Sequence, residues 1–199
     1  MNDFYIFDDF LTIEEQDYIE NYLTVNTKIC WKFLDDITYP TTHNKKRLIT
    51  KYTPAIMLQI FNPSKNVLYQ EVLDNVIKIL FKSCKKINIT PKEVLNVRSF
   101  ISFPLIKSTP QKYNNPHVDL HTPHMVCLYY VNDTDGDTFF FDKTLKDVDM
   151  EKYKDTKFEV LNRVTPKKGR VVIFNGERYH ASSDPTKNIR CIVNFDFTT

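Results

Sequence analysis

Residues 166–180 read PKKGRVVIFNGERYH, and they decide how the second half of the chain is interpreted. A turn around Gly169 is followed by the strand-like run 170–174, which is β-branched or aromatic from 171 onward, by a second turn at 175–176 and then by His180. A short apolar run between two turns is typical of a buried strand. We therefore expect a buried strand and a turn that deliver His180 to the mouth of a β-barrel.

The rest of the second half has the same β-rich character, in which β-branched and aromatic runs alternate with turn-rich pieces. Strands are expected at 94–103, 125–132, 138–141, 158–161, 170–174 and 188–197. The chain has only three glycines, Gly136, Gly169 and Gly176, and each stands among turn-type residues between strand-like runs. Each is therefore expected to hold a backbone conformation that other residues resist.

The first half contains two helix-like segments. Residues 12–15 have the spacing of a capping box, so a helix is expected over 13–23. A second helix is expected over 65–85, because apolar residues recur there at spacings of three and four. A short strand is expected at 4–7. A second capping pattern at 90–93 is interpreted as a single turn that leads into a strand.

Helices first and about eight strands afterwards predict an α+β, mainly β fold. The expected architecture is a double-stranded β-helix, a jelly-roll or cupin-like barrel, braced on one face by the N-terminal helices. With 199 residues, 42% of them hydrophobic and 14% aromatic, the chain is expected to form one domain over 1–199. Residues 1–90 would be the helical support region and 91–199 the jelly-roll core. Loops with one or two strands are expected over 31–63.

The composition argues against several classes of partner. The formal net charge is +2 and the basic residues are spread along the chain, so no nucleic-acid or membrane partner is called for. No apolar run approaches the roughly 18 residues that cross a bilayer, and the N-terminus does not have the basic region of a leader. The four cysteines, Cys30, Cys84, Cys127 and Cys191, form no Cys-x-x-Cys pair, which favours buried free thiols in a reducing cytoplasm.

His117, Asp119 and His180 form the pattern that points to chemistry. His117 and Asp119 stand two positions apart, so on an extended segment both side chains leave the same side of the backbone. His180 then supplies a third ligand from a distant strand. Two imidazoles and one carboxylate on one face of a metal ion leave coordination positions open, a set typical of non-haem Fe(II) oxygenases. A His-x-Asp tripeptide alone is a weak signal, and the pattern before His180 is what strengthens it.

Arg190 lies ten residues after His180, in the middle of the strand expected at 188–197. By alternation it shares a face with Ile192, Asn194 and Asp196. An arginine at such a position needs a partner. Its planar guanidinium matches a carboxylate through two parallel hydrogen bonds, so a bound dicarboxylate is one candidate. A structural ion pair, for example with Asp196, is the alternative.

These residues resemble the 2-oxoglutarate and Fe(II)-dependent dioxygenases, in particular the prolyl-4-hydroxylase-like branch found also in phages and bacteria. The resemblance covers most of the chain: 4–11 look like the opening of that branch, and 96–198 look like its catalytic barrel. It implies that His117, Asp119 and His180 hold Fe(II), and that Arg190 pairs with the distal carboxylate of 2-oxoglutarate.

The resemblance also implies a tyrosine on the same carboxylate. Leu128 and Tyr130 face one way in their strand, so Tyr130 is the expected second anchor, with Leu128 and Asn194 as further contacts to the co-substrate. Thr138 lies in a segment that resembles the family's Gly-Gly-x-Thr and is expected to line the same pocket. A Thr on the surface face of a strand is its alternative reading.

Two positions depart from the family's pattern. Phe100 stands where the branch often carries a tyrosine, which removes a hydroxyl near the metal, and the connection 103–117 is long. Ile192 stands where many relatives place a serine beside the basic residue. The first change bears on the choice of a prolyl substrate. The second makes binding of the co-substrate more dependent on Tyr130.

The implied activity is hydroxylation of a C–H bond with 2-oxoglutarate and O2 as co-substrates, release of succinate and CO2, and ascorbate as a reductant. A prolyl or other amino-acid side chain in a peptide or protein is the preferred substrate, and a small molecule is the other option. Three stretches are expected to cover the site: 32–62, 104–115 and 142–157, with Tyr39, Tyr52 and Tyr113 as aromatic contacts.

Other functional classes remain as alternatives. AlkB-like nucleic-acid demethylases share the triad but carry a second arginine six residues after the anchoring one, where this chain has Asp196. A non-catalytic metal-binding jelly roll would lose a ligand, and here none is missing. A sugar-binding or structural β-protein would not explain why His117, Asp119, His180 and Arg190 occur together.

The remaining histidines allow one further metal hypothesis. His117, His121 and His124 lie close enough in sequence for a three-histidine zinc site, but that site would leave His180 and Arg190 without roles. We expect His121 and His124 at the rim of the pocket or behind the ligands. His43, in a basic loop, is expected to be solvated.

Overall fold

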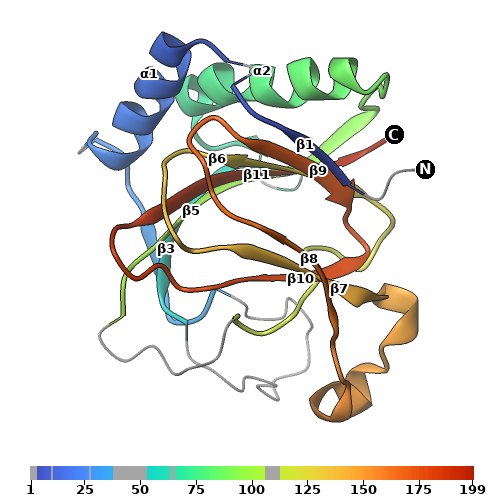
Figure 1. Ribbon diagram of the computed structural model, residues 1–199. Helices are drawn as coiled ribbons and strands as arrows, with labels where there is room; N and C mark the ends of the chain where they lie inside the picture. Colours follow the sequence, from blue (N-terminus) through green and yellow to red (C-terminus); the bar gives the residue numbers. More distant parts are fainter. Residues whose placement is uncertain are drawn as a thin grey trace.

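The computed structural model describes residues 4–9, 11–26, 28–37, 53–62, 64, 66–105 and 113–199. In this part of the chain, two antiparallel sheets lie face to face, and two α-helices lie along the outer face of the larger sheet (Figure 1). The predicted fold class is confirmed, because a mainly β double-stranded β-helix is braced by its N-terminal helices.

The larger sheet has the strand order β1-β9-β6-β11-β5-β3-β2, with β4 paired to β3 off this path. Its strands are β1 (Phe4–Phe7), β2 (Lys32–Leu34), β3 (Ala55–Asn62), β4 (Asn66–Val67), β5 (Glu93–Ser102), β6 (Met125–Tyr130), β9 (Val171–Asn175) and β11 (Arg190–Thr198). The C-terminal strand β11 thus lies between β5 and β6. In its register, Asn194 stands opposite Arg98 of β5 and Leu128 of β6, which places these three residues in one row across the sheet.

The smaller sheet has the order β10-β7-β8, and its strands are β7 (Thr138–Thr144), β8 (Val160–Val164) and β10 (Arg178–Ser182). The expected surface excursion 142–157 contains two short 3-10 helices, η1 (Leu145–Asp147) and η2 (Met150–Asp155). An aromatic cluster holds this excursion against the smaller sheet. Its rings belong to Tyr113, Phe139, Phe141, Tyr153, Phe158 and Tyr179.

The helix expected over 13–23 is confirmed as α1 (Ile13–Thr24). Its capping box is complete: the Glu15 backbone N–H donates to Thr12 Oγ1 at 3.2 Å, and the Thr12 backbone N–H donates to Glu15 Oε2 at 3.1 Å. These bonds satisfy two backbone donors that helix geometry leaves free.

The helix expected over 65–85 begins later, as α2 (Gln70–Lys86). The predicted start was wrong because the segment before Gln70 remains extended. Strand β4 pairs with β3, and the backbone N–H groups of Leu68 and Tyr69 both donate to the carbonyl of Ile60. These bonds to β3 replace the bonds of a first helical turn.

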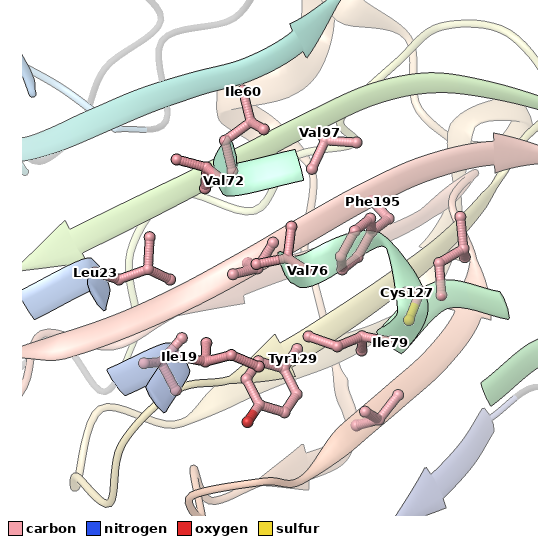
Figure 2. Packing of buried hydrophobic residues seen from close by; sticks show 14 of the residues in the cluster. Ile19, Leu23, Ile60, Val72, Val76, Ile79, Val97, Cys127, Tyr129 and Phe195 are labelled. Carbon is pink, nitrogen blue, oxygen red and sulfur yellow. The ribbon is translucent and has the colours of Figure 1, made fainter. Parts of the chain in front are cut away.

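The main core lies between the helices and the larger sheet (Figure 2). Ile19 and Leu23 of α1 and Val76 and Ile79 of α2 are each at most 1% exposed. They pack in one cluster with the sheet residues Ile60, Val97, Cys127, Tyr129 and Phe195. Full burial of one such aliphatic side chain contributes about 1.5 to 3 kcal/mol, so the helices are held mainly by this apolar face.

The alternation predicted for β11 is confirmed by two separate clusters. Cys191, Val193 and Phe195 belong to the core under the helices, whereas Ile192 belongs to a second cluster between the sheets. Arg190, Asn194 and Asp196 therefore lie on the inner face of the barrel. The three polar residues that the alternation predicted on one face of β11 thus lie on the side of the candidate site.

Two smaller expectations are corrected. No helical turn forms at 90–93: the Lys92 backbone N–H donates to the Thr198 carbonyl at 2.9 Å, and this bond to the C-terminal strand keeps the chain extended into β5. All four cysteines are free and three are buried, but Cys30 is exposed because it precedes the short edge strand β2.

Within the described part of the chain, no helix has the length and apolar character that a membrane span requires.

Gly169 offers a test of how the helical layer is joined to the sheet. Its φ is +79°, and its N–H donates to the Tyr130 carbonyl at 3.0 Å. A Cβ at this position would collide with the side-chain amide of Gln16 on α1. We predict that Gly169→Ala lowers the free energy of unfolding, by about 1 to 2 kcal/mol from the left-handed backbone alone and by more from the collision.

Urea denaturation of wild type, Gly169→Ala, Gln16→Ala and the double variant would check this prediction. Gln16→Ala removes the colliding amide, so the double variant should lose less stability than the sum of the two single changes. Strict additivity would contradict the close contact that the structure shows between Gly169 and α1.

Candidate metal centre

The two histidines of the predicted triad face each other across a short antiparallel bridge. The His117 backbone N–H donates to the His180 carbonyl at 2.9 Å, and the His180 N–H donates back to the His117 carbonyl at 2.9 Å. The ring centroids lie 4.6 Å apart. Backbone pairing thus brings together two positions separated by 63 residues, and no side chain is needed to do so.

Each imidazole is oriented by a bond from its Nδ1 atom. His117 Nδ1 lies 3.0 Å from the Asn115 carbonyl oxygen, and His180 Nδ1 lies 3.1 Å from the Arg178 carbonyl oxygen. Because a carbonyl oxygen only accepts hydrogen bonds, both bonds place the proton on Nδ1. The lone pair of each Nε2 atom is then free to bind a metal.

Asp119 completes the group on the same side of the chain as His117. Its Oδ2 atom lies 3.5 Å from His180 Nε2. One ligand atom from each of His117, Asp119 and His180 lies within 4.8 Å of the others. No other such group of metal-ligating side chains occurs in the described part of the chain. The convergence predicted from the sequence is therefore confirmed as a candidate two-histidine, one-carboxylate site.

Burial and neighbouring charges set the protonation states that a metal needs. Burial lowers the pKa of His117 to about 4, and the neighbouring His180 acts in the same direction. Burial raises the pKa of Asp119, but the charge of Arg98 outweighs this effect and holds it well below its usual range. At neutral pH, His117 is therefore neutral and Asp119 is ionised, as metal ligation requires.

The triad lines a pocket of about 130 Å³ between the two sheets. Its walls combine the three ligands with two arginines and with apolar and aromatic side chains. Among the predicted co-substrate residues, four line this pocket: Leu128, Thr138, Arg190 and Asn194. The structure thus brings these four together with the triad, while their contacts to a co-substrate stay predictions.

Arg190 is 2% exposed and is fixed at two of its nitrogen atoms. Its Nε donates to the Gly136 carbonyl at 2.7 Å, and its Nη2 donates to Thr138 Oγ1 at 2.9 Å. A Cβ on Gly136 would lie 2.8 Å from Arg190 Cδ, so the turn at Gly136 leaves room for this side chain. In the described part of the chain, no carboxylate forms an ion pair with Arg190, so the alternative pairing with Asp196 is wrong.

Tyr130 lies beneath this arrangement. It is fully buried, its hydroxyl donates to Thr138 Oγ1 at 2.7 Å, and its ring lies under the Arg190 guanidinium at 5.7 Å. It is not among the residues that line the pocket. The structure therefore shows Tyr130 supporting Thr138 and Arg190, and its own contact with a carboxylate stays a prediction.

The sequence reasoning missed Arg98, which contacts the candidate ligand Asp119. Arg98 Nη2 donates to Asp119 Oδ1 at 3.0 Å and to Asp196 Oδ2 at 2.8 Å. Burial lowers the pKa of Arg98, but the charges of Asp196 and Asp119 raise it above its ordinary value. Asp196 is fully buried, and this burial holds its pKa well above the usual range although Arg98 acts against it. The available signal was an arginine in the middle of an apolar strand.

The other expectations for this region have mixed outcomes. His121 is exposed at the pocket, as expected for a rim residue. His124 is buried and packs over Gly176, where an added Cβ would collide with its ring. Neither joins the ligand group, so the three-histidine zinc hypothesis is wrong. Residues 38–52 and 106–112, which include Tyr39, Tyr52 and His43, lie outside the described residues.

The expected aromatic contacts and the Phe100 departure can be placed. Tyr113 packs on Phe139 and Phe141 in the aromatic cluster and does not line the pocket. Phe100 lines the pocket, and the Arg98 guanidinium lies 5.6 Å from its ring centroid. The aromatic ring at position 100 therefore supports the arginine that contacts Asp119.

The donor set fits a divalent transition metal of the iron type. Two neutral imidazoles and one carboxylate are intermediate ligands, and as a three-atom set they leave open positions on an octahedral ion. The second bond of each imidazole goes to a backbone carbonyl, the arrangement that usually orients metal-binding histidines. The fold and this site define a double-stranded β-helix protein with a candidate two-histidine, one-carboxylate metal centre.

Comparison with solved structures gives the same fold. A prolyl hydroxylase from Trichoplax adhaerens, in complex with a hypoxia inducible factor oxygen degradation domain peptide, matches with a TM-score of 0.57 and 13% identity over 100% of this chain and 84% of that chain. HygX from Streptomyces hygroscopicus, with nickel, 2-oxoglutarate and hygromycin B bound, matches with a TM-score of 0.60 and 13% identity over 98% of this chain and 82% of that chain.

A viral collagen prolyl hydroxylase from Paramecium Bursaria Chlorella virus-1 matches with a TM-score of 0.52 and 16% identity over 100% of this chain and 91% of that chain. No protein-family model matches the sequence, and no curated protein is similar to it. The structural neighbours are thus 2-oxoglutarate and Fe(II) oxygenases of low sequence identity, and the likeness establishes the fold.

The partly buried His117 imidazole, whose pKa is lowered, predicts a pH dependence of the metal-free protein. Its pKa is about 4 when folded and about 6.5 when unfolded. Between these values the unfolded state binds more protons, so stability falls as the pH falls. We predict that acidification from pH 7 to pH 4 costs wild type up to about 3 kcal/mol more than it costs a His117→Asn variant.

Urea denaturation of both proteins in the presence of a chelator measures this difference, and the variant cancels the contributions of other titrating groups such as Asp196. Equal losses in the two proteins would contradict the lowered pKa of His117.

Proposed function

We propose that the protein is an Fe(II)- and 2-oxoglutarate-dependent dioxygenase that hydroxylates a C–H bond of its substrate and releases succinate and CO2. The observation that carries the proposal is the meeting of His117, Asp119 and His180, with ligand atoms within 4.8 Å, in the same pocket as Arg190. A buried arginine without an anionic partner in the described chain complements a carboxylate of the co-substrate.

The roles of the residues follow from their positions. His117 and His180 present Nε2 and Asp119 presents Oδ2, and together they would hold Fe(II) at the pocket. Bound Fe(II) supplies the activation of O2 that is coupled to the oxidative decarboxylation of 2-oxoglutarate. Arg190 and Thr138 would hold the distal carboxylate, with Tyr130 fixing Thr138 from behind. The pocket between the two sheets would orient the substrate next to the metal.

The preferred substrate is a prolyl or other amino-acid side chain in a peptide or protein. Apolar and aromatic side chains contribute much of the pocket lining, among them Met150, Tyr153 and Tyr179. Such a surface suits a neutral side chain with little charge. The complex of the Trichoplax prolyl hydroxylase with a peptide is consistent with this preference.

A small molecule is the second candidate, and the HygX structure with hygromycin B shows that this fold can hold one. Peptides, free amino acids and small polyhydroxylated compounds can be screened for stimulated turnover of 2-oxoglutarate, with mass spectrometry to detect the gain of one oxygen atom. Methylated nucleotides in the same screen test the AlkB-like alternative. The class of compound that gains an oxygen atom distinguishes an amino-acid side chain, a small molecule and a nucleotide as the substrate.

The proposal predicts that His180→Ala abolishes succinate formation without unfolding the protein. The bridge to His117 is made by backbone atoms, so alanine can keep both hydrogen bonds while removing one metal ligand. Succinate should form in wild type only when Fe(II), 2-oxoglutarate, ascorbate and O2 are all present. Circular dichroism checks the fold of the variant, and a variant that turns over at the wild-type rate would refute the ligand assignment.

For the co-substrate, the proposal predicts that Arg190→Met raises the KM for 2-oxoglutarate by roughly 10- to 100-fold, because hydrogen bonds to a charged group are lost. Lys146→Met is the control, since this side chain is exposed on η1 and lies outside the pocket. Steady-state kinetics with 2-oxoglutarate as the varied substrate measures both. Equal KM values in the two variants would exclude Arg190 as the anchor.

A further inference from the structure

The two oxygen atoms of Asp119 have different surroundings. Oδ1 accepts a hydrogen bond from Arg98 Nη2 at 3.0 Å. Oδ2 lies 3.5 Å from His180 Nε2 and also accepts from Asn194 Nδ2 at 3.2 Å. One oxygen of the carboxylate therefore faces the other ligand atoms, while the second is bound to a guanidinium.

Arg98 is held in place from several sides. Its Nη2 is shared between Asp119 and the fully buried Asp196, and its guanidinium lies against the ring of Phe100. Its backbone pairs with Asn194 in the centre of the larger sheet. Asn194 Nδ2 also donates to Asp196 Oδ1 at 3.2 Å, so the two carboxylates are connected by both side chains. The two carboxylates and the Phe100 ring thus hold the guanidinium beside Asp119.

We infer that Arg98 is a positioning residue that restricts Asp119 to a single metal-binding oxygen, Oδ2. A free carboxylate can bind a metal through one or both oxygens. Hydrogen bonding of Oδ1 to Arg98, supported by Asp196, removes the second mode. Asn194 reinforces the arrangement, because its amide holds Oδ2 in the direction of His180.

The inference rests on the proposed function and explains what that function requires of Asp119. Three protein atoms on an octahedral ion leave about three positions open. The keto acid group of 2-oxoglutarate would take two of them, and O2 would need the third. A carboxylate that bound through both oxygens would occupy one of these positions and compete with a co-substrate.

The test compares two variants that differ only in the guanidinium. Asp196→Asn keeps Arg98 bound to Asp119 and is the matched control. The double variant Arg98→Met/Asp196→Asn removes the Arg98 cation together with the Asp196 carboxylate. Position 196 therefore carries no unpaired buried charge once the arginine is gone. Each protein and wild type is loaded with Mn²⁺, and the exchangeable waters on the bound ion are counted by electron spin-echo spectroscopy in D2O. Binding of 2-oxoglutarate to the Mn²⁺-loaded proteins is measured by calorimetry.

Wild type and Asp196→Asn should hold about three waters on Mn²⁺, and the double variant about two. The double variant should also bind 2-oxoglutarate at least about 10-fold more weakly than Asp196→Asn. Three waters in the double variant, or two in wild type, would overturn the inference. A count of two waters in wild type would overturn it even if the double variant does not fold. Absence of Mn²⁺ binding by folded wild type would instead refute the proposed metal site, and the inference with it.

Discussion

The backbone bridge between His117 and His180 is the interaction on which the arrangement of the site depends. It joins a segment without regular secondary structure to β10, and the Asn114 N–H extends the pairing with a bond to the Ser182 carbonyl at 2.8 Å. The Tyr153 hydroxyl donates to the Pro116 carbonyl at 2.6 Å from the excursion between β7 and β8. His117 is thus placed by main-chain bonds on one side and by an aromatic residue on the other, and Asp119 follows two residues later.

The charges inside the barrel are arranged in two groups. Arg98 lies between the partly buried Asp119 and the fully buried Asp196 and compensates two carboxylates that would otherwise repel each other. Arg190, at the other end of β11, has only neutral oxygen atoms as hydrogen-bond partners in the described chain. Burying a guanidinium without an anion is unfavourable. The positive charge of Arg190 is therefore not compensated by an anion in the described part of the folded chain, and a bound carboxylate would compensate it.

Local patterns in the sequence predicted the parts of the structure that local rules determine. The capping box at Thr12 and the alternation along 188–197 gave the helix α1 and the inner face of β11, because both depend on neighbouring residues. The start of α2 and the partners of Arg98 depend on which strands lie side by side, and residue order does not state this. Arg98 meets Asp196, 98 positions away, only because the C-terminal strand inserts beside β5. The alternation of residues predicted which side chains of a strand share a face, but it did not predict which strands pair with each other.

Gly136 and Arg190 are linked by space, although 54 positions separate them. The guanidinium is anchored on the carbonyl of this glycine, and its Cδ atom occupies the volume that a Cβ would need. A larger residue at 136 is therefore compatible only with a shorter or differently directed side chain at 190. In diverging descendants of this chain, residues 136 and 190 should therefore change together, because a side chain at one position limits the size of the side chain at the other.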